Sequence, residues 1–360
     1  MYYNVVVTYE CNKRCRYCGL YKLETPLPKE ITYSIEELKR FIEKDLEPVI
    51  TFYGGEPLLR IKTIETIMDN IKAKRFMLQT NGIFLHMLRP RYLRRFHTIL
   101  LSIDGSKKIT DFYRGEGTYD KVIENAKLIR KRGFKGNLIA RMTVSEETDI
   151  FNEVKWLLFL KEPKFDFIFW QLNMMFGDIK LWRDPNYWIK NKYNPGIVKL
   201  IKFWLKAMFN SKVYKILPFL AIMRDMLQHR SSKLRCGAGF VFFTIATNGN
   251  ISPCPVTAEF NLLTAGNIKE TSPSELYDSF KIGMPCTKCK FLYICGGRCL
   301  FANYFKPWGE HGYKMVCSTV KNMINSLLKI KPIVERLIKE NVISLNDFEY
   351  TEFDGCEIIP

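Results

Sequence analysis

The sequence predicts an α/β protein: a partial (β/α)6 TIM-like barrel, then a small cysteine-rich domain and a C-terminal helix. Three observations lead to this prediction. Short β-branched or aromatic runs alternate with amphipathic helical stretches over residues 1–175. These runs are almost continuously apolar, which is typical of parallel strands covered on both faces. The cysteines gather at the start of the chain and in its last third.

Six segments have the character of strands, and amphipathic helices separate them. The helix that begins near Ser34 has a capping box, because Glu37 follows three residues later. The helix over 118–133 takes Thr118 as N-cap and Gly133 as C-cap. The predicted strands are NVVVTYE (4–10), EPVITFY (47–53), RFMLQTN (75–81), HTILLSID (97–104), NLIARMTV (137–144) and FDFIFWQLN (165–173).

Four parts follow from this pattern. The barrel core is expected over 1–176 and a helical bridge over 177–235, where aromatic and basic residues either contact an acidic peptide or simply pack as a spacer. The cysteine-rich domain is expected over 236–320 and opens with a hairpin whose turn is TNGN at 247–250. The last part, 321–360, contains most of a helix expected from about residue 318 to 341 and then an acidic tail.

The composition limits the class of protein. Among 360 residues, 47% are hydrophobic, and no apolar run approaches the roughly 18 residues that a membrane span needs. The N-terminus lacks the pattern of a targeting peptide, so a cytoplasmic protein without a membrane is expected. The net charge of +18 suits an acidic peptide or nucleic acid, but it also suits the solvated charged helices of thermophile proteins. We do not expect nucleic-acid binding from charge alone.

Eleven cysteines in a reducing compartment predict metal ligands rather than disulfides. The segment CNKRCRYCG (11–19) supplies three thiols with the spacing C-x3-C-x2-C, one fewer than a closed iron–sulfur or zinc site uses. The other polar segments also follow strands, and the carboxyl ends of parallel strands lie at one edge of a sheet. These segments are GGEPLL (54–59), QTNG (79–82), SIDG (102–105), Arg141 within strand five and WQLN (170–173).

This triad, with Tyr17 before its last cysteine, resembles the signature of the radical SAM superfamily. The resemblance implies that Cys11, Cys15 and Cys18 hold a [4Fe-4S] cluster whose open iron binds S-adenosyl-L-methionine. One-electron reduction would then release a 5′-deoxyadenosyl radical that abstracts a substrate hydrogen. The sequence identifies no further catalytic side chain.

The same resemblance assigns the contacts to S-adenosylmethionine. The segment Gly54, Gly55, Glu56 and Pro57 resembles the family's GGEP motif, which meets the methionyl ammonium. Two alternatives remain open: Glu56 as a helix-initiating acid, and Arg141 as a surface salt-bridge residue. The other contacts implied are Ser102 and Asp104 at the ribose, Arg141 at the methionyl carboxylate and Tyr17 beside the adenine.

The C-terminal cysteines resemble the SPASM domain, which holds two auxiliary iron–sulfur clusters, expected as [4Fe-4S]. The resemblance assigns Cys286, Cys289, Cys295 and Cys317 to one cluster. It assigns Cys236, Cys254 and Cys299 to the other, which lacks a fourth thiolate. That site is open, or is completed by Cys356 or by an oxygen ligand. Zinc remains the alternative for the spacing C-x2-C-x5-C-x3-C.

The resemblance implies a peptide or protein substrate, modified by thioether formation, C–C crosslinking or oxidation, and a reductant such as ferredoxin or flavodoxin. An anaerobic sulfatase-maturing enzyme is the first alternative, but Pro255 stands where that group carries an aspartate base. An RNA or small-molecule radical SAM enzyme is the second. A ferredoxin-like carrier or a zinc-stabilised scaffold is the non-enzyme alternative, although neither needs the polar loops at the sheet edge.

Overall fold

The structure is a computed structural model that describes residues 1–19, 25–174, 179–352 and 359–360. It divides into two compact units. Unit 1 contains residues 1–141, 161–165 and 237–281, and unit 2 contains 142–160, 166–236 and 282–360.

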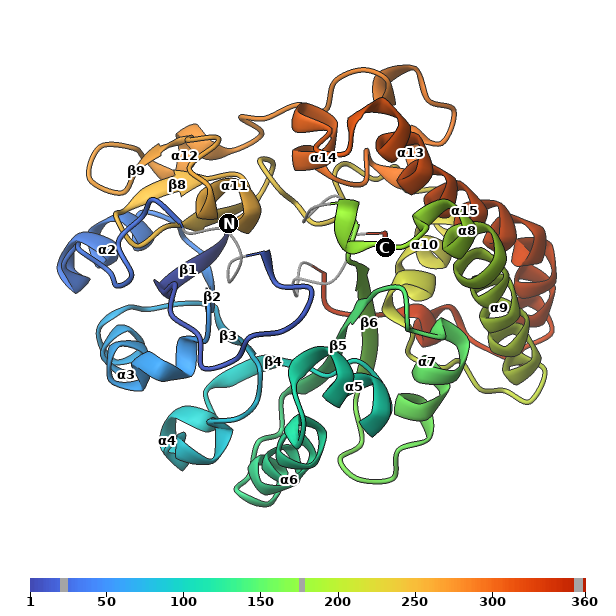
Figure 1. The fold of residues 1–360 in the computed structure, drawn as a ribbon, viewed down its shortest axis with the longest axis horizontal. Helices are drawn as coiled ribbons and strands as arrows, with labels where there is room; N and C mark the ends of the chain where they lie inside the picture. Colours follow the sequence, from blue (N-terminus) through green and yellow to red (C-terminus); the bar gives the residue numbers. More distant parts are fainter. Residues whose placement is uncertain (20–24, 175–178, 353–358) are drawn as a thin grey trace. The chain divides into compact units, whose positions relative to one another are not determined.

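Unit 1 is built on a mainly parallel sheet in the order β5-β4-β3-β2-β1-β7-β8-β9. Its helices α2, α3, α4 and α6 lie outside the curved row of strands (Figure 1). The structure contains all six predicted barrel strands, and each begins and ends within two residues of its predicted bounds. The fifth strand continues into unit 2, and the sixth lies in unit 2. The strands of this sheet are β1 (Tyr2–Thr8), β2 (Val49–Gly54), β3 (Arg75–Thr80), β4 (Phe96–Ser102), β5 (Asn137–Val144), β7 (Phe242–Ile245), β8 (Asn250–Ser252) and β9 (Gly266–Asn267).

The sheet is apolar on both faces, as its sequence pattern predicts. Consecutive residues of one strand are buried, so their side chains are covered on both sides. Unit 1 also contains helices and turns, several of which lie outside the row of strands. They are α2 (Ile35–Ile42), η1 (Pro57–Arg60), α3 (Ile61–Asn70), η2 (Leu85–Met87), α4 (Pro90–Leu93), α5 (Lys107–Arg114), α6 (Thr118–Lys131), α11 (Pro255–Glu259) and α12 (Pro273–Leu276). The buried strand residues include Val5, Val6, Ile50, Phe52, Met77, Leu78, Ile99, Leu100, Leu138 and Ile139.

Two predicted caps can be compared directly with the structure. The capping box of α2 is confirmed, since Ser34 Oγ accepts from Glu37 N and Glu37 Oε2 accepts from Ser34 N. The predicted N-cap of α6 is wrong: Gly117, in a left-handed conformation, caps the helix, and Thr118 is its first residue. At the other end Arg132 is the C-cap, and Gly133 follows with φ 92°.

The predicted hairpin is confirmed, but it joins the barrel sheet. β7 pairs in parallel with β1, from Tyr2↔Phe242 to Val5↔Ile245, and β8 returns antiparallel beside it. Residues 237–281 therefore pack with unit 1, whereas Cys286, Cys289, Cys295, Cys299 and Cys317 belong to unit 2. This grouping differs from the predicted boundary at 236, because strand pairing and not chain continuity determines which residues pack together.

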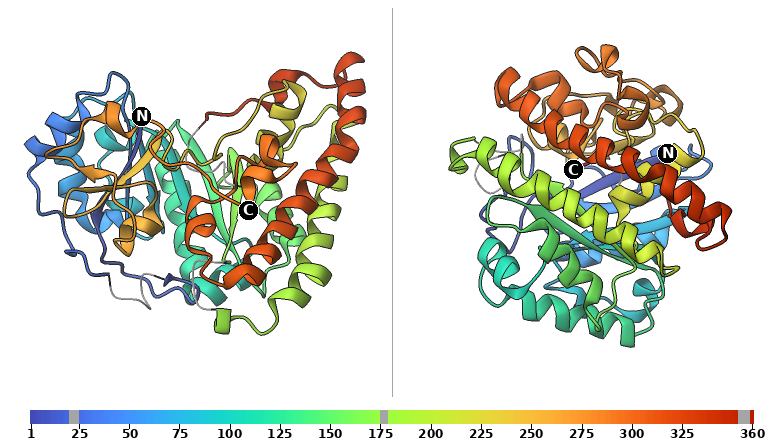
Figure 2. Two further views of the ribbon diagram at one scale, coloured as in Figure 1. Left: turned by 90° about the horizontal axis from the view of Figure 1, so that it is seen from above. Right: turned by 90° about the vertical axis from the view of Figure 1, so that its right-hand side faces the viewer.

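Unit 2 is mostly helical. Its long helix α15 lies along α9 in both views of Figure 2, and the two helices are in contact. The strand β6 ends beside β5, where Asn173 N donates to Val144 O. The elements are α7 (Ile150–Phe159), β6 (Phe167–Leu172), η3 (Ile179–Leu181), α8 (Pro185–Trp188), η4 (Ile189–Tyr193), α9 (Asn194–Met208), α10 (Leu217–Leu227), η5 (Cys286–Lys288), α13 (Leu292–Cys295), α14 (Leu300–Phe305), α15 (Gly309–Lys339) and η6 (Leu345–Phe348).

The bridge helices are packed elements. α9 buries an apolar stripe that includes Trp204 at 0% exposure, and leaves lysines on its opposite side. The C-terminal helix begins at Gly309, about nine residues before the predicted start, because its apolar stripe already includes Val316. Cys317 therefore lies on a helix. Among the described residues, no helix has the length and apolarity that crossing a membrane requires.

Candidate functional site

The three N-terminal cysteines lie on one short loop that follows β1. Cys11 is exposed, whereas Cys15 and Cys18 are partly buried. A turn brings the last two together, because Cys18 N donates to Cys15 O at 3.0 Å, and Lys13 N donates to the sulfur of Cys11 at 3.4 Å. Burial raises the pKa of Cys15, and the nearby Arg114 acts in the opposite direction.

Neighbouring elements fix this loop from three sides. Lys13 Nζ donates to Thr118 Oγ1 of α6 at 2.7 Å, and Arg16 N donates to Tyr113 O of α5 at 2.8 Å. From the end of β3, Asn81 Nδ2 donates to Asn12 Oδ1 at 2.8 Å. The thiols are thus presented on a loop whose backbone position is determined by the barrel.

Tyr17 is tied to the barrel by a buried ion pair. Its hydroxyl donates to Asp104 Oδ2 at 2.7 Å, and Arg114 donates to both oxygens of Asp104 at 2.8 Å. Asp104 is 0% exposed and Arg114 is 7% exposed. The pKa of Tyr17 is raised by burial, opposed by Arg114 and reinforced by Asp104. Arg114 was not among the predicted site residues; it lies ten residues after Asp104, at the end of α5.

The glycines of GGEP allow the ends of β1 and β2 to approach closely. A Cβ on Gly55 would lie 2.2 Å from Glu10 O, and one on Gly54, whose φ is 141°, would lie 2.0 Å from Thr8 O. The backbone bonds Gly55 N to Thr8 O and Glu56 N to Glu10 O follow from this approach. Backbone proximity therefore requires glycine here, independently of any ligand.

Glu56 is completely buried and hydrogen-bonded within the chain. Its carboxylate accepts from Leu58 N at 3.0 Å, Thr80 Oγ1 at 2.7 Å and Asn81 N at 2.7 Å. It caps η1, of which Pro57 is the first residue, so the helix-initiating role is present in the structure. Burial raises its pKa to about 7, although these three hydrogen bonds act in the opposite direction.

The two remaining predicted contacts lie side by side on neighbouring strands. Ser102 of β4 pairs with Arg141 of β5 in the sheet register. Arg141 acts electrostatically on Tyr53, which directly precedes the GGEP segment: burial raises the pKa of Tyr53 to about 12, and Arg141 lowers it. All the predicted S-adenosylmethionine contacts therefore belong to unit 1, and they lie within β2, β4 and β5 or on the segments that follow β1, β2 and β4.

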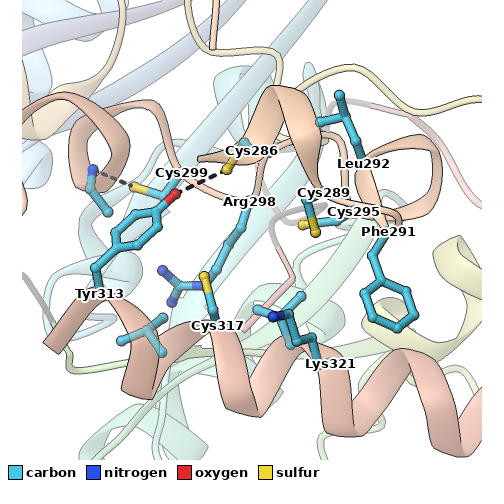
Figure 3. A pocket seen from close by; sticks show the side chains of 14 residues that line it. Cys286, Cys289, Phe291, Leu292, Cys295, Arg298, Cys299, Tyr313, Cys317 and Lys321 are labelled. Atoms are coloured by element: carbon cyan, nitrogen blue, oxygen red, sulfur yellow. Dashed lines mark hydrogen bonds between the residues drawn. The ribbon is translucent and has the colours of Figure 1, made fainter. Parts of the chain in front are cut away.

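The C-terminal cysteines line a cavity of about 50 Å³ in unit 2 (Figure 3). Several of the same residues also line an adjoining pocket of about 300 Å³. Cys317 comes from α15, and the other four come from the turns and short helices before it. The structure thus brings together five thiols that are separated by up to 31 residues. They are Cys286, Cys289, Cys295, Cys299 and Cys317.

Hydrogen-bond donors surround these thiols. The hydroxyl of Tyr313 lies 3.0 Å from the sulfur of Cys286, and Ala302 N donates to the sulfur of Cys299 at 3.5 Å. Burial raises the pKa of Cys295, and hydrogen bonds from the backbone of Gly297 and Arg298 lower it. Burial also raises the pKa of Cys317, to about 11, with Cys286 adding to the rise.

The predicted second set does not come together in one unit. Cys254 lies in unit 1, whereas Cys236 and Cys299 lie in unit 2, and Cys356 lies outside the described residues. Cys299 lines the cavity of the first set. Across residues 1–19, 25–174, 179–352 and 359–360, no three His, Cys, Asp or Glu side chains converge as one metal ion would require.

Comparisons with known proteins match both the sequence and the fold. Residues 5–154 match the sequence profile of the Radical SAM superfamily. A cysteine-type anaerobic sulfatase-maturating enzyme of Clostridium perfringens is 27% identical over 335 residues, covering 80% of this chain and 85% of that protein. The radical SAM cyclopropyl synthase TigE of Paramaledivibacter caminithermalis is 23% identical, covering 90% of this chain and 73% of that protein.

Solved structures extend the likeness of the fold to nearly the whole chain. The structure of anSMEcpe with bound AdoMet aligns with a TM-score of 0.72 at 22% identity, covering 95% of this chain and 97% of that one. Streptococcus suis SuiB bound to S-adenosylmethionine aligns with a TM-score of 0.57 at 15% identity, covering 83% and 72%. The α/β fold with its parallel sheet and C-terminal helix is therefore confirmed. Residues 5–154 are thus identified as a radical SAM domain, and the chain as a whole is similar to the sulfatase-maturating enzyme of Clostridium perfringens.

Proposed function

We propose that the chain modifies a side chain of a peptide or protein, and that the loop carrying Cys11, Cys15 and Cys18 is the centre of this activity. The observation that carries the proposal is the geometry of this loop: three soft ligands on one turn, held from β3, α5 and α6. Bound there with S-adenosylmethionine, a [4Fe-4S] cluster would supply a 5′-deoxyadenosyl radical that takes a hydrogen atom from the substrate.

The donor set suits this group. Thiolates are the usual ligands of iron–sulfur clusters, and three of them leave one iron for S-adenosylmethionine. The positively charged Lys13 and Arg114 lie against the loop, where they offset the charge of the thiolates. Glycine at 54 and 55 keeps side chains away from the adjoining backbone.

The remaining contacts are proposed with roles adapted to their surroundings. We assign Asp104 to hold Tyr17 in place, since its carboxylate is already engaged by Tyr17 and Arg114. Arg141 is the cation we assign to the methionyl carboxylate, and Ser102 is its neighbour in the sheet. Glu56 holds the ends of β2 and β3 together and caps η1 directly after the two glycines of the GGEP segment.

The cavity of unit 2 is proposed as the auxiliary iron–sulfur site. Cys286, Cys289, Cys295 and Cys317 are assigned as its ligands, and the surrounding N–H and O–H donors stabilise negative charge on sulfur. The second auxiliary site, with Cys236, Cys254 and Cys299, is also a proposal, and its fourth position is open or is filled by Cys356 or an oxygen ligand.

A peptide substrate is supported by the relatives. anSMEcpe has been solved with the Cp18Cys peptide, and SuiB with its precursor peptide SuiA. The net charge of +18 favours an acidic peptide. A ferredoxin or flavodoxin is proposed as reductant, and the cytoplasm as the compartment.

Maturation of a sulfatase is the second candidate. The similarity to the Clostridium perfringens enzyme over 80% of this chain favours it. Pro255 is the first residue of α11, and its side chain cannot accept a proton. This difference leads us to prefer another peptide or protein modification.

The test is anaerobic reconstitution with iron and sulfide, followed by dithionite reduction with S-adenosylmethionine. Wild-type protein should hold about twelve irons and release 5′-deoxyadenosine. A variant with Cys11, Cys15 and Cys18 all replaced by Ala should lose about four irons and all of that product. Iron-loaded wild-type protein that releases none would overturn the proposal. Incubation with an acidic peptide and a sulfatase peptide, read by mass spectrometry, separates the two candidates.

A further inference from the structure

We propose that Arg298 is the counter-cation of the auxiliary site and sets its reduction potential through the guanidinium group that it holds against the cysteine cavity. This inference rests on the proposed assignment of that cavity to an iron–sulfur cluster. It concerns a positioning residue, since Arg298 is not itself a ligand.

The first observation is the position of the side chain. Arg298 lines the cavity and is only 6% exposed. In Figure 3 its side chain extends from the loop toward α15 and Cys317. Cys299 follows it directly in the chain, and both Cys299 and Cys317 line the same cavity. The buried cation and the thiols therefore share one cavity wall.

The second observation is the hydrogen bonding of the guanidinium. Nε donates to the carbonyl oxygen of Ile359 at 3.0 Å, which fixes the plane of the group. Nη1 and Nη2 are shielded from solvent, and no described residue accepts a hydrogen bond from either. An arginine buried in this way is costly unless an anion satisfies it.

The third observation is the composition of the cavity wall. Among the described residues that line it, none is Asp or Glu, and the groups able to carry negative charge are the cysteine thiols and the hydroxyl of Tyr313. The nearby Tyr313 hydroxyl already interacts with Cys286. Cysteine sulfur is thus the anionic group of the cavity wall that can neutralise the guanidinium.

The fourth observation is the backbone that places Arg298. Gly296, Gly297 and Arg298 all have positive φ, at 69°, 93° and 32°. This region is unfavourable for a side chain such as arginine, and such conformations persist only where surrounding structure holds them. A Cβ at Gly297 would lie 2.7 Å from Ile282, so the turn is also tightly packed. The same turn directs the N–H groups of Gly297 and Arg298 at Cys295.

These observations give a direction for the electrostatic effect. Four thiolates bring negative charge into a buried cavity, and one-electron reduction of a cluster held there adds one more. A fixed positive charge favours the reduced form, most strongly where water is excluded. Replacing the arginine by a neutral side chain should therefore make the reduction potential more negative.

The experiment uses the full chain with Cys11, Cys15 and Cys18 replaced by Ala, so that the N-terminal cluster does not contribute. Arg298→Gln, Arg298→Lys and the control Lys321→Gln are made in this background. Lys321 lines the same cavity but is exposed, so solvent screens its charge. Each protein is reconstituted, its iron is counted, and the auxiliary signals are followed by EPR in a redox titration.

We expect Arg298→Gln to lower the ratio of reduced to oxidised cluster at least tenfold at the potential where the parent is half reduced. For a one-electron couple this equals a shift of about 59 mV. Arg298→Lys should recover part of the shift, and Lys321→Gln should give little.

Equal potentials in Arg298→Gln and Lys321→Gln would overturn the inference. If Arg298→Gln loses iron, the Arg298→Lys variant distinguishes the two explanations. Iron retained by Arg298→Lys, with a potential close to that of the parent, supports a role of the positive charge. Loss of iron in both variants overturns the inference. A wrong assignment of the cavity to a cluster would give a different result from a wrong role of Arg298. In that case the double variant Cys286→Ala, Cys289→Ala would leave the iron content of the background protein unchanged.

Discussion

The hydroxyl of Tyr17 donates a 2.7 Å hydrogen bond to Oδ2 of Asp104, a residue 87 positions further along the chain. This contact joins the N-terminal cysteine loop to the end of β4, and Arg114 completes it from α5. Because Asp104 is fully buried, the loop and the barrel edge are positioned together. The stability of the fold and the geometry of the cysteine loop therefore depend on the same three side chains.

Replacement of Asp104 by Asn should lower the free energy of unfolding by about 3–5 kcal/mol, because the guanidinium of Arg114 is left buried without its charge partner. Urea denaturation of the metal-free protein measures this change. Asp120→Asn is the control, since Asp120 pairs with Lys107 on the surface at 63% exposure and should cost less than about 1 kcal/mol. Equal effects of the two substitutions would contradict the structural role of Asp104.

Glu259 should make stability depend on pH. Burial raises the pKa of this carboxyl to about 7, from 4.5, and no described residue partners its shielded Oε1. The folded state thus binds the proton more tightly than the unfolded state. The stabilising contribution is complete below about pH 4.5 and is lost as the pH rises through about 7.

The variant Glu259→Gln should therefore be more stable than wild type at pH 8, by about 3 kcal/mol, and about equally stable near pH 4.5. Thermal unfolding of both proteins across this pH range measures the difference. Glu36→Gln, at an exposed position on α2, is the control and should show no gain at pH 8. A gain that is the same at every pH would assign the effect to something other than the carboxyl charge.

Local patterns predicted much of the fold. Apolar runs located the six barrel strands, and the capping box of α2 could be predicted because all its atoms lie within four residues. Contacts between distant segments could not be predicted in this way. Nothing local to β7 indicates that it pairs with β1, some 240 residues earlier, and nothing near Asp104 distinguishes Arg114 from other charges on α5.

For the predicted site, too, local motifs could be predicted and contacts between distant segments could not. Motifs located Cys11, Glu56 and Arg141 on loops or strands at one sheet edge, as parallel topology requires. Their individual contacts depend on packing that no motif describes: Glu56 bonds to β3, and the required glycine at 55 faces the backbone of Glu10.

Gly55→Ala should disturb the cysteine loop through the backbone of Glu10. The added Cβ would lie 2.2 Å from Glu10 O, and backbone atoms cannot move aside as a flexible side chain can. We expect a loss of about 2–3 kcal/mol in the free energy of unfolding, as for other overpacked positions. The control is Gly283→Ala, where the nearest atom, Oδ1 of Asn303, lies 3.4 Å away. Comparable stability of the two variants would rule out the close approach of β1 and β2 as the reason for glycine.

Thr118 anchors the cysteine loop, and its removal should affect the N-terminal cluster selectively. Its hydroxyl is buried at the start of α6 and accepts a hydrogen bond from Lys13, two residues after Cys11. Thr118→Val keeps the shape and removes the acceptor, so Lys13 loses the contact that holds the loop against α6. Reconstituted protein should then lose up to about four irons and most 5′-deoxyadenosine release, while the auxiliary EPR signals remain. Thr66→Val is the matched control, because Thr66 is exposed on α3 and bonds only within its own helix. Uniform loss of iron from all sites in Thr118→Val would mean that the residue supports the fold as a whole, whereas selective loss would tie the loop's geometry to this single hydroxyl.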